Sequence, residues 1–316
     1  IKCMKSSGKW WVLAIIVVVA LAVLVPVLRK GEPTEPGVAV DQEQPAATVA
    51  TKPTNKDTFV YATIGGGPDS LDGAYAYDNA SGGIIYQLYD NLVQYDGENT
   101  DKFLPMLATE VPTIENGLIS PDGKTYKFPL RKGVKFHNGN TLTPEDVAYT
   151  VQRLMLADPD GGPCWMLIEP LLGTMTIKDY AMQVAGVDDF DKVDAASLRK
   201  VAEDVKKAVT VDGDYVVFNL KNPYPPFMGI LAHNSSWTAV MDKEWMIANG
   251  AWDGNVDTWV KWHNLAKEKM VAYDKANGTG PFVLKAWDKN NKQVILERFE
   301  DYWREPAKLK TVYVKY

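Results

Sequence analysis

The segment at residues 122–154 constrains the fold most, because it predicts a turn, a half-buried strand and a capped helix in direct succession. Residues 120–124 (SPDGK) are typical of a tight turn, and residues 125–130 (TYKFPL) place apolar side chains at alternate positions, as a strand with one buried face does. Thr143 can cap a helix that has Pro144 at its first position and two acidic residues in its first turn. This succession indicates a mixed α/β or α+β body.

The same mixture of strands and helices continues along the chain. Asp194 is a predicted helix N-cap, and apolar residues follow it at helical spacing. Pro129 predicts an edge position for the strand at 125–130, because proline lacks a backbone donor. Further strands are predicted at residues 58–64, 215–220, 282–287, 293–298 and 312–316, and helices at residues 84–93, 194–209 and 242–249.

An apolar run from Trp10 to Leu28 contains no charged residue and is flanked by lysine and arginine. It is long enough to cross a bilayer as a helix. The small-x-small pattern that signal peptidase needs occurs only at residues 20–22, and apolar residues continue beyond it. We therefore expect residues 1–30 to form a membrane anchor or uncleaved signal segment. Residues 31–56, rich in Pro, Ala, Thr and Glu, are predicted to be a flexible linker before a globular body at 57–316.

The composition argues against nucleic-acid binding, metal binding and catalysis. The net charge is -6, and no block of Lys and Arg occurs in the body. Cys3 and Cys164 cannot build a disulfide framework, and His137, His233 and His263 have no metal-ligand or nucleophile spacing. The GxSxG and HExxH patterns are also missing. We expect a protein that is not an enzyme, with no catalytic residues, metal or cofactor.

Several motifs occur in the order seen in one known family. The longest is DGKTYKFPLRKGVKFHNGNTLTPEDVAYTVQRL at residues 122–154, in which a Phe-x-Leu-Arg strand precedes a Val-x-Phe-x-x-Gly turn and a capped helix. Shorter motifs are SLD at 70–72, YDNL at 89–92, NGTGPF at 277–282 and FEDYW at 299–303. From about residue 57 to residue 316 the chain resembles the family 5 extracellular solute-binding proteins, the oligopeptide-, dipeptide- and nickel-binding components of ABC importers.

This resemblance implies an α/β fold of the periplasmic-binding-protein-like type II (cluster C) kind, of which only the N-terminal half is expected here. Residues 57–316 would form the first lobe, with a subdomain of about residues 93–208 inserted into it, and the second lobe would be absent. The strand at 312–316 would then be left open, with unpaired backbone groups.

The resemblance also implies a function in uptake. The protein would capture peptides, in particular oligo- or dipeptides, by reversible non-covalent binding at the extracytoplasmic face of the cell membrane, either periplasmic or at the cell surface. Its partners would be a peptide or other small solute, the ABC permease subunits and, through the N-terminal helix, the membrane. One alternative within the family is a binder of metal chelates or oligosaccharides. An alternative of another class is a tethered extracellular hydrolase, against which the missing catalytic motifs argue.

The resemblance places the ligand cleft at four parts of the sequence. The implied ligand-binding residues are Tyr75, Tyr77, Asn79, Trp165, His233, Trp237 and Phe282. Phe282 stands where tyrosine is common in the family, so this position lacks a hydroxyl that could contact a ligand. The residues that hold the charged ends of a peptide are expected in the absent half.

Overall fold

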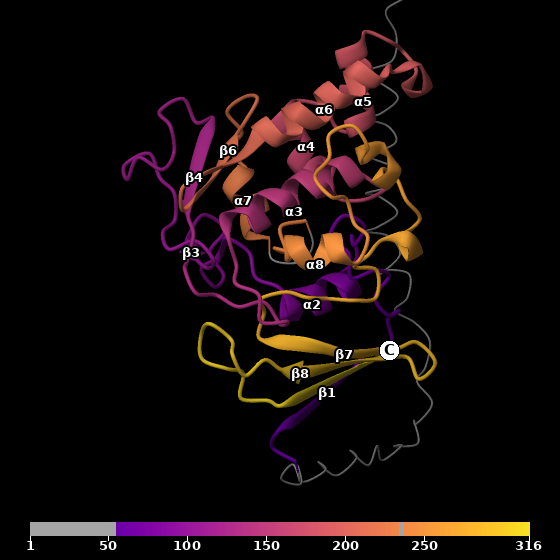
Figure 1. Ribbon diagram of the computed structural model, residues 1–316. Coiled ribbons are helices and arrows are strands. Elements are labelled where there is room, and N and C mark those ends of the chain that lie inside the picture. The colour runs from indigo at the N-terminus through magenta and orange to yellow at the C-terminus, as the bar shows by residue number, and fades with distance from the viewer. Residues whose placement is uncertain (1–54, 234–236) are drawn as a thin grey trace, which may run out of the picture. The chain divides into compact units, whose positions relative to one another are not determined.

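The computed structural model describes residues 55–233 and 237–316, and their largest sheet joins the two ends of that range (Figure 1). This sheet has the order β1-β9-β8-β7. Strand β1 (Thr58–Ala62) pairs in parallel with β9 (Thr311–Lys315), while β8 (Gln293–Arg298) lies antiparallel to both β9 and β7 (Phe282–Asp288). The expectations of strands near residues 58, 282, 293 and 312 are confirmed.

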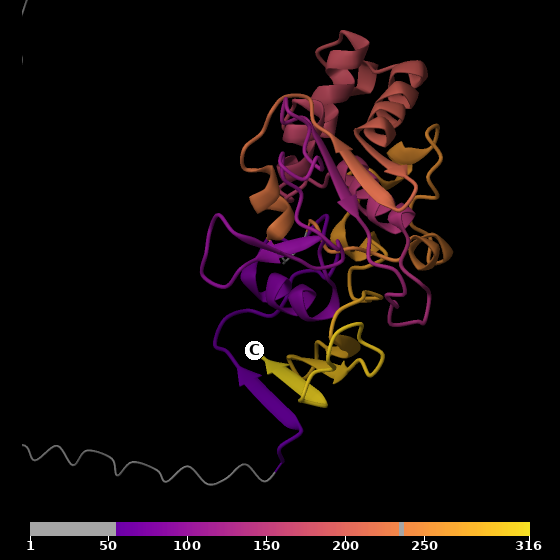
Figure 2. The same ribbon diagram turned by 90° about the vertical axis from the view of Figure 1, so that its left-hand side faces the viewer.

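The expectation of an open strand at residues 312–316 is wrong, because β9 lies inside the sheet between β1 and β8. The partner that sequence reasoning missed is β1, which comes from the other end of the body. Figure 2 shows the two strands side by side, with β1 at the edge. Phe59 and Tyr61 of β1 are 50% and 53% exposed, so apolar side chains of this edge strand remain exposed.

A second sheet has the antiparallel order β4-β6-β5, with β4 (Thr125–Pro129) at its edge, as Pro129 predicts. Strand β5 (Val209–Asp212) and strand β6 (Tyr215–Asn219) form a hairpin. The predicted subdomain boundary at residue 208 assigned this hairpin to the other part of the body. Its hydrogen bonds to β4 instead place it in the sheet of the inserted segment. The remaining division into a lobe and a subdomain stays a prediction.

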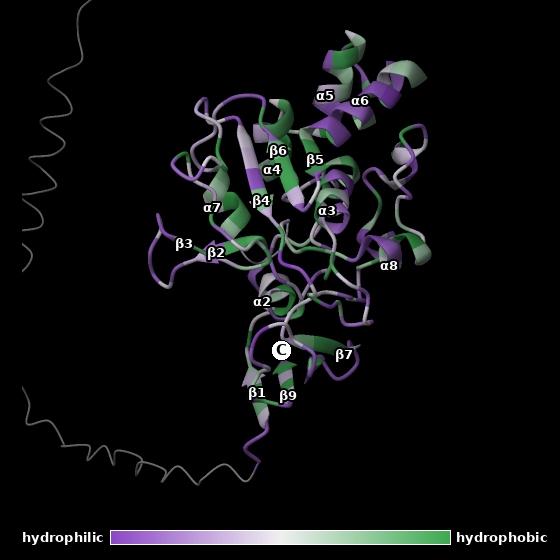
Figure 3. Ribbon diagram, turned by 60° about the vertical axis from the view of Figure 1, so that its left-hand side comes forward, coloured by the Kyte–Doolittle hydropathy of each residue, from purple (hydrophilic) through white to green (hydrophobic). Residues whose placement is uncertain are grey.

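Helices α3 (Pro144–Ala157) and α6 (Ala195–Ala208) both contact β5 and β6. The start of α3 is as predicted: Thr143 and Asp146 form a capping box, in which the Asp146 carboxylate accepts from the Thr143 backbone N–H at 2.8 Å. The predicted N-cap of α6 is also confirmed, because the Asp194 carboxylate accepts from the Ser197 N–H at 2.9 Å. In Figure 3, β5 and β6 are largely hydrophobic in colour, whereas much of the α6 ribbon is hydrophilic in colour.

Helix α2 (Asn79–Leu88) begins five residues before the predicted start at Ile84 and ends before the predicted end at Val93. The earlier start follows from Asp78, whose carboxylate accepts from the Ser81 N–H at 2.8 Å. The backbone is already extended at Tyr89. The remaining elements are β2 (Val93–Tyr95), β3 (Phe103–Pro105), α4 (Trp165–Leu172), α5 (Ile177–Ala185), α7 (Phe227–Ala232), α8 (Lys243–Ala248) and the 3-10 helices η1 (Phe190–Lys192), η2 (Trp259–Trp262) and η3 (Lys267–Lys269).

A buried ion pair joins α3 to the loop before α2. Arg153 on α3 donates to Asp72 through two parallel hydrogen bonds of 2.8 and 2.5 Å. The two side chains are only 7% and 0% exposed. A bidentate pair of this kind fixes both distance and orientation, so it holds the start of α2 against the helical part of the body.

The predicted anchor at residues 1–30 lies outside the described residues, as does all of the predicted linker at 31–56 except its last two positions. Within the part of the chain that the structure describes, none of the helices combines the length and the apolar character that crossing a membrane requires.

Candidate functional site

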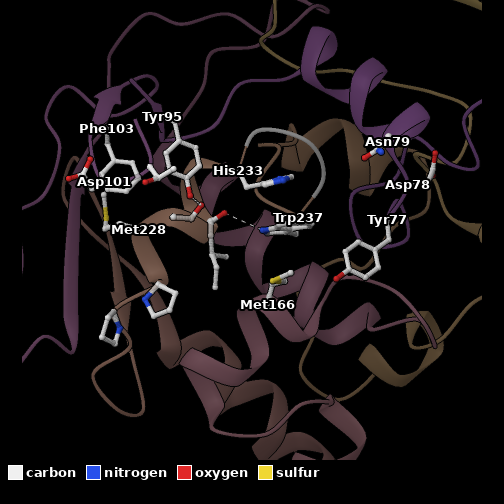
Figure 4. A pocket seen from close by; sticks show the side chains of 15 residues that line it. Tyr77, Asp78, Asn79, Tyr95, Asp101, Phe103, Met166, Met228, His233 and Trp237 are labelled. Carbon is white, nitrogen blue, oxygen red and sulfur yellow. Dashed lines mark hydrogen bonds between the residues drawn. The ribbon is translucent and has the colours of Figure 1, made fainter. Parts of the chain in front are cut away.

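A pocket of about 810 Å³ opens where the start of α2, the β2–β3 ribbon and the segment around α7 meet (Figure 4). Tyr77 and Asn79 reach it from the start of α2, and His233 and Trp237 from the segment after α7. Its volume lies within the range of small-molecule sites in proteins. The pocket is therefore the candidate ligand site among the residues described here.

One wall of the pocket is built from stacked rings. His233 lies on Trp237 with ring centroids 4.7 Å apart and an interplanar angle of 18°. Tyr77 meets the edge of Trp237 at 6.1 Å and 81°. The indole N–H of Trp237 donates to the Ile230 carbonyl at 3.2 Å, which anchors the ring to α7. The polar atom of the indole is thus satisfied within the protein, and the Trp237 side chain is only 5% exposed.

The opposite wall comes from β2 and β3. Tyr95 packs against Phe103 with centroids 5.3 Å apart, and its hydroxyl donates to the Gly229 carbonyl at 3.2 Å. A Cβ atom at position 229 would lie 2.7 Å from the Tyr95 hydroxyl oxygen, so a side chain there would require the end of Tyr95 to shift. Met166 and Met228 add flexible apolar surface to the lining.

Asn91 forms hydrogen bonds to the segment that carries the aromatic wall of the pocket. The Asn91 side-chain amide donates to the Thr238 hydroxyl at 2.7 Å and to the Leu231 carbonyl at 3.2 Å. The Thr238 hydroxyl in turn donates to the His233 carbonyl at 3.2 Å. Because Asn91 is fully buried, these bonds are shielded from water and hold both sides of the wall in place.

The neighbouring Asp90 carboxylate gathers donors from the C-terminal part of the chain. It accepts from the Thr279 hydroxyl at 2.9 Å, from the Tyr302 hydroxyl at 3.0 Å and from the Trp303 indole at 2.9 Å. Burial raises the pKa of Asp90 above its usual value, although these three donors oppose the shift. The YDNL and FEDYW motifs are therefore joined to each other in space.

The seven residues predicted for the ligand cleft are only partly brought together. Tyr77, Asn79, His233 and Trp237 line the same pocket. Tyr75 lies instead beneath Lys267, whose ammonium is 5.9 Å from its ring. In α4 it is Met166, not Trp165, that reaches the pocket. Phe282 is 6% exposed and belongs to the hydrophobic core.

Sequence reasoning missed the β2–β3 side of the pocket, including Tyr95, Asp101 and Phe103. No local pattern in the sequence places residues 95–103 near residues 225–237. The only signal at α7 is the Pro225-Pro226 pair, which marks a loop without saying what it faces.

A second hollow of about 740 Å³ shares Asp78 and Asn79 with the first. It lies between the ends of β1 and β9 and the start of α2, and Gly65, Gly66 and Tyr316 are among its lining residues. The start of α2 therefore contributes to both hollows.

The described residues contain no group of three or more His, Cys, Asp and Glu side chains that could hold a metal ion. His137 instead binds the backbone of the NGTGPF motif: its Nε2 lies 3.1 Å from the Gly280 carbonyl oxygen, and its Nδ1 lies 3.3 Å from the Gly278 nitrogen. Burial lowers the pKa of His137 to about 4. These contacts describe a neutral, structural imidazole.

Comparison with known proteins shows partial matches to longer chains. The oligopeptide-binding protein OppA of Bacillus subtilis is 27% identical over 248 residues, which are 78% of this chain and 36% of the relative. The dipeptide-binding protein of Escherichia coli is 26% identical over 277 residues, which are 84% of this chain and 42% of the relative. The chain thus spans about two fifths of the length of these relatives.

Solved structures show the same partial coverage. The oligopeptide-binding protein AppA from Bacillus subtilis, in complex with a nonapeptide, superposes with a TM-score of 0.56 at 24% identity, covering 82% of this chain and 39% of that one. DppA from Helicobacter pylori, in complex with the peptide STSA, gives a TM-score of 0.53 at 23% identity, covering 82% and 42%. At this identity the likeness establishes the fold, an incomplete type II periplasmic-binding-protein fold.

A family model described as "Bacterial extracellular solute-binding proteins, family 5 Middle" matches residues 102–316, which is more than half of the chain. The match includes the capped helix α3, the β4-β6-β5 sheet and the Thr279–Trp303 region that converges on Asp90. The protein therefore belongs to the family 5 bacterial extracellular solute-binding proteins.

Proposed function

We propose that this protein binds peptides reversibly and without covalent chemistry, as the extracytoplasmic substrate-binding component of an ABC importer. The observation that carries the proposal is the aromatic pocket, in which Tyr77, His233 and Trp237 form one wall of a space of about 810 Å³. Relatives named as oligopeptide- and dipeptide-binding proteins support the choice of peptide as ligand. The ABC permease subunits would be its protein partners.

The proposal assigns binding rather than catalysis, in keeping with a family of solute-binding proteins. The pocket offers ring faces, thioethers and backbone carbonyls, which recognise shape and hydrogen-bonding groups. Tyr77, Asn79, His233 and Trp237 would contact the ligand, whereas Asn91 would position the wall that carries two of them.

Titration of the full chain with short peptides tests this proposal through two matched tyrosines. Tyr77 lines the pocket and is 51% exposed, whereas Tyr86 on α2 is 47% exposed and does not line it. We expect Tyr77→Ala to weaken peptide binding about fivefold or more, since aromatic contacts of this kind contribute about 1 kcal/mol or more. Tyr86→Ala should leave the affinity within about twofold. Equal effects of the two variants would move the site elsewhere, and no binding by the unsubstituted chain would overturn the function.

We further propose that residues 1–30 hold the protein at the outer face of the cell membrane, through the apolar run from Trp10 to Leu28. Residues 31–56 would act as the tether between the membrane and the body. Cell fractionation combined with protease treatment of intact cells tests this arrangement. The body should be cut from outside while the N-terminal segment stays with the membrane. A released protein that begins at Val23 or later would contradict the anchor.

A further inference from the structure

We infer that the pocket selects ligands carrying an additional positive charge, such as short peptides containing lysine or arginine, an inference that rests on the proposed function. The first observation is the charge of the lining. Asp78 and Asp101 contribute carboxylates to the pocket, and the lining residues that the structure describes include no lysine or arginine. A ligand cation entering this space would meet attraction, and a ligand carboxylate would meet repulsion.

The second observation is that both carboxylates are available to a ligand. Neither Asp78 nor Asp101 forms an ion pair with any lysine or arginine of residues 55–233 and 237–316. Asp78 uses one carboxylate oxygen, Oδ1, to accept the hydrogen bond from Ser81 that caps α2. Its second oxygen has no hydrogen-bond partner among the described residues, and neither carboxylate has a cationic partner there.

The third observation is the arrangement of the apolar surface between the two charges. Figure 4 shows Asp101 at one side of the pocket beside Phe103 and Tyr95, and Asp78 at the other side beyond Tyr77, with Trp237 between them. Aromatic faces attract cations, and the thioethers of the two methionines suit an aliphatic stem. A lysine or arginine side chain combines these needs, because its apolar stem can cover the rings while its charged head reaches a carboxylate.

Three tripeptides of similar shape test the inference: Gly-Lys-Gly, Gly-norleucine-Gly and Gly-Glu-Gly. Each is titrated into the full 316-residue chain while the indole N–H signal of Trp237 is followed by NMR, which measures even millimolar affinities; a Trp237→Phe variant assigns the signal. A carboxylate near the surface contributes about 0.2–1 kcal/mol to an ion pair, or up to about fivefold in affinity. We expect the lysine peptide to bind several-fold more tightly than the norleucine peptide, and the glutamate peptide to bind most weakly.

Two charge-removing variants locate the effect. Asp78→Asn retains a good helix cap, and the Asp101 side chain that Asp101→Asn changes forms no hydrogen bond within residues 55–233 and 237–316, so both variants should fold. Each should reduce the ratio of lysine to norleucine affinity by up to about fivefold. Asp188→Asn, on an exposed loop distant in sequence from the pocket residues, should leave the ratio unchanged. The ratio should also shrink between 50 and 500 mM salt, since screening weakens exposed charge pairs.

The outcomes separate the two levels of the argument. Equal affinity for the lysine and norleucine peptides, or a ratio that neither aspartate variant changes, would overturn the charge preference while peptide binding stands. Failure of all three peptides to shift the Trp237 signal would overturn the proposed function together with this inference.

Discussion

At the scale of single residues, Arg153 and Asp72 form an ion pair in which both side chains are buried. Arg153 is 7% exposed and Asp72 is 0% exposed, and the two share paired hydrogen bonds. Removing two charges from water costs several kcal/mol per ion, and this cost is offset only while both partners are present. The pair therefore specifies how α3 meets the loop before α2 more than it adds to stability.

Replacing one partner should accordingly be far worse than replacing both. We expect Arg153→Met to lower the free energy of unfolding by about 3–5 kcal/mol, because the Asp72 carboxylate is left buried without a cation. The double variant Arg153→Met, Asp72→Leu should recover much of this loss. Urea unfolding of the single and double variants measures both values, with the exposed Arg199→Met as the control that should change little. A single variant as mild as Arg199→Met would contradict this account.

His137 makes the stability of the protein depend on pH. Its pKa is lowered to about 4 from the usual 6.5. Between pH 4 and pH 6.5, the imidazole is therefore largely protonated in the unfolded chain and largely neutral in the folded protein. The free energy of unfolding should therefore fall as the pH is lowered from about 6.5 to about 4, by at most about 1.4 kcal/mol per pH unit. Urea unfolding across this range, for the unsubstituted protein and for His137→Gln, measures the contribution as a difference between the two slopes.

The two slopes must be subtracted because buried carboxyl groups change the free energy of unfolding with pH in the opposite direction. Burial raises the pKa of Asp158 to about 6, so the stability associated with its protonated form is lost as the pH rises from the usual 3.8 toward 6. This contribution is common to both proteins and cancels. Parallel slopes for the unsubstituted protein and His137→Gln would show that the imidazole can be protonated without cost to the fold.

At the scale of elements, the C-terminal end of α2 is fixed by the glycines of the NGTGPF motif. The Gly280 N–H donates to the Leu88 carbonyl at 3.0 Å. A Cβ atom at position 280 would lie 2.5 Å from the Leu88 carbonyl carbon and 2.6 Å from the Tyr89 nitrogen. Two segments distant in sequence thus touch through their backbones, which explains why small residues recur in this motif.

Two glycine-to-alanine substitutions distinguish the effect of this backbone contact on stability from the effect of helix propensity. Gly280→Ala should lower the free energy of unfolding by about 1–3 kcal/mol or more, because the added methyl group would press on the backbone of α2. Gly83→Ala, inside α2 with no atom within 4 Å of the added Cβ, should instead raise it by about 0.5–1 kcal/mol. Denaturant unfolding of both variants is the measurement. The same sign for both would mean that the close approach at Gly280 can relax.

At the scale of the whole described chain, β9 holds the largest sheet together. It pairs residue by residue with β1 from Thr58 to Ala62 and with β8 from Gln293 to Glu297. The Trp287 indole also donates to the Tyr316 hydroxyl at 2.8 Å, which ties the residue after β9 to β7. The α3 and β4-β6-β5 part contributes no strand to this sheet.

Shortening the chain to end at Lys310 should therefore release β1 selectively. Without β9, the backbone amides of residues 58–62 have no strand partner, and we expect their hydrogen exchange to become fast. The amides of α3 should stay protected, because their contacts lie elsewhere. Hydrogen exchange measured by mass spectrometry compares the chain that ends at Lys310 with a chain that ends at Val314, which keeps most of the pairing between β1 and β9. Continued protection of residues 58–62 in the shorter chain would contradict the assigned sheet order.

Sequence alone determined the features that are encoded within a few neighbouring residues. The Thr143 cap with Pro144, the Asp194 cap and the edge position of Pro129 each depend on one residue type and its immediate neighbours, and all three are present in the structure. The ordered motifs likewise identified the family and the fold class. Such signals need no knowledge of what packs against them.

Tertiary structure decided which segments meet. The pairing of β1 with β9 joins residues near 60 and 313, and the pocket joins Tyr77, Tyr95 and Trp237. Tertiary packing also decided that Trp165 and Phe282 do not line the pocket, although both are large and aromatic. Met166 is the residue of α4 that lines the pocket, and Phe282 belongs to the core. Long-range contacts arise from the packing of complementary surfaces and from backbone groups that must find partners, and neither is encoded in any one local pattern.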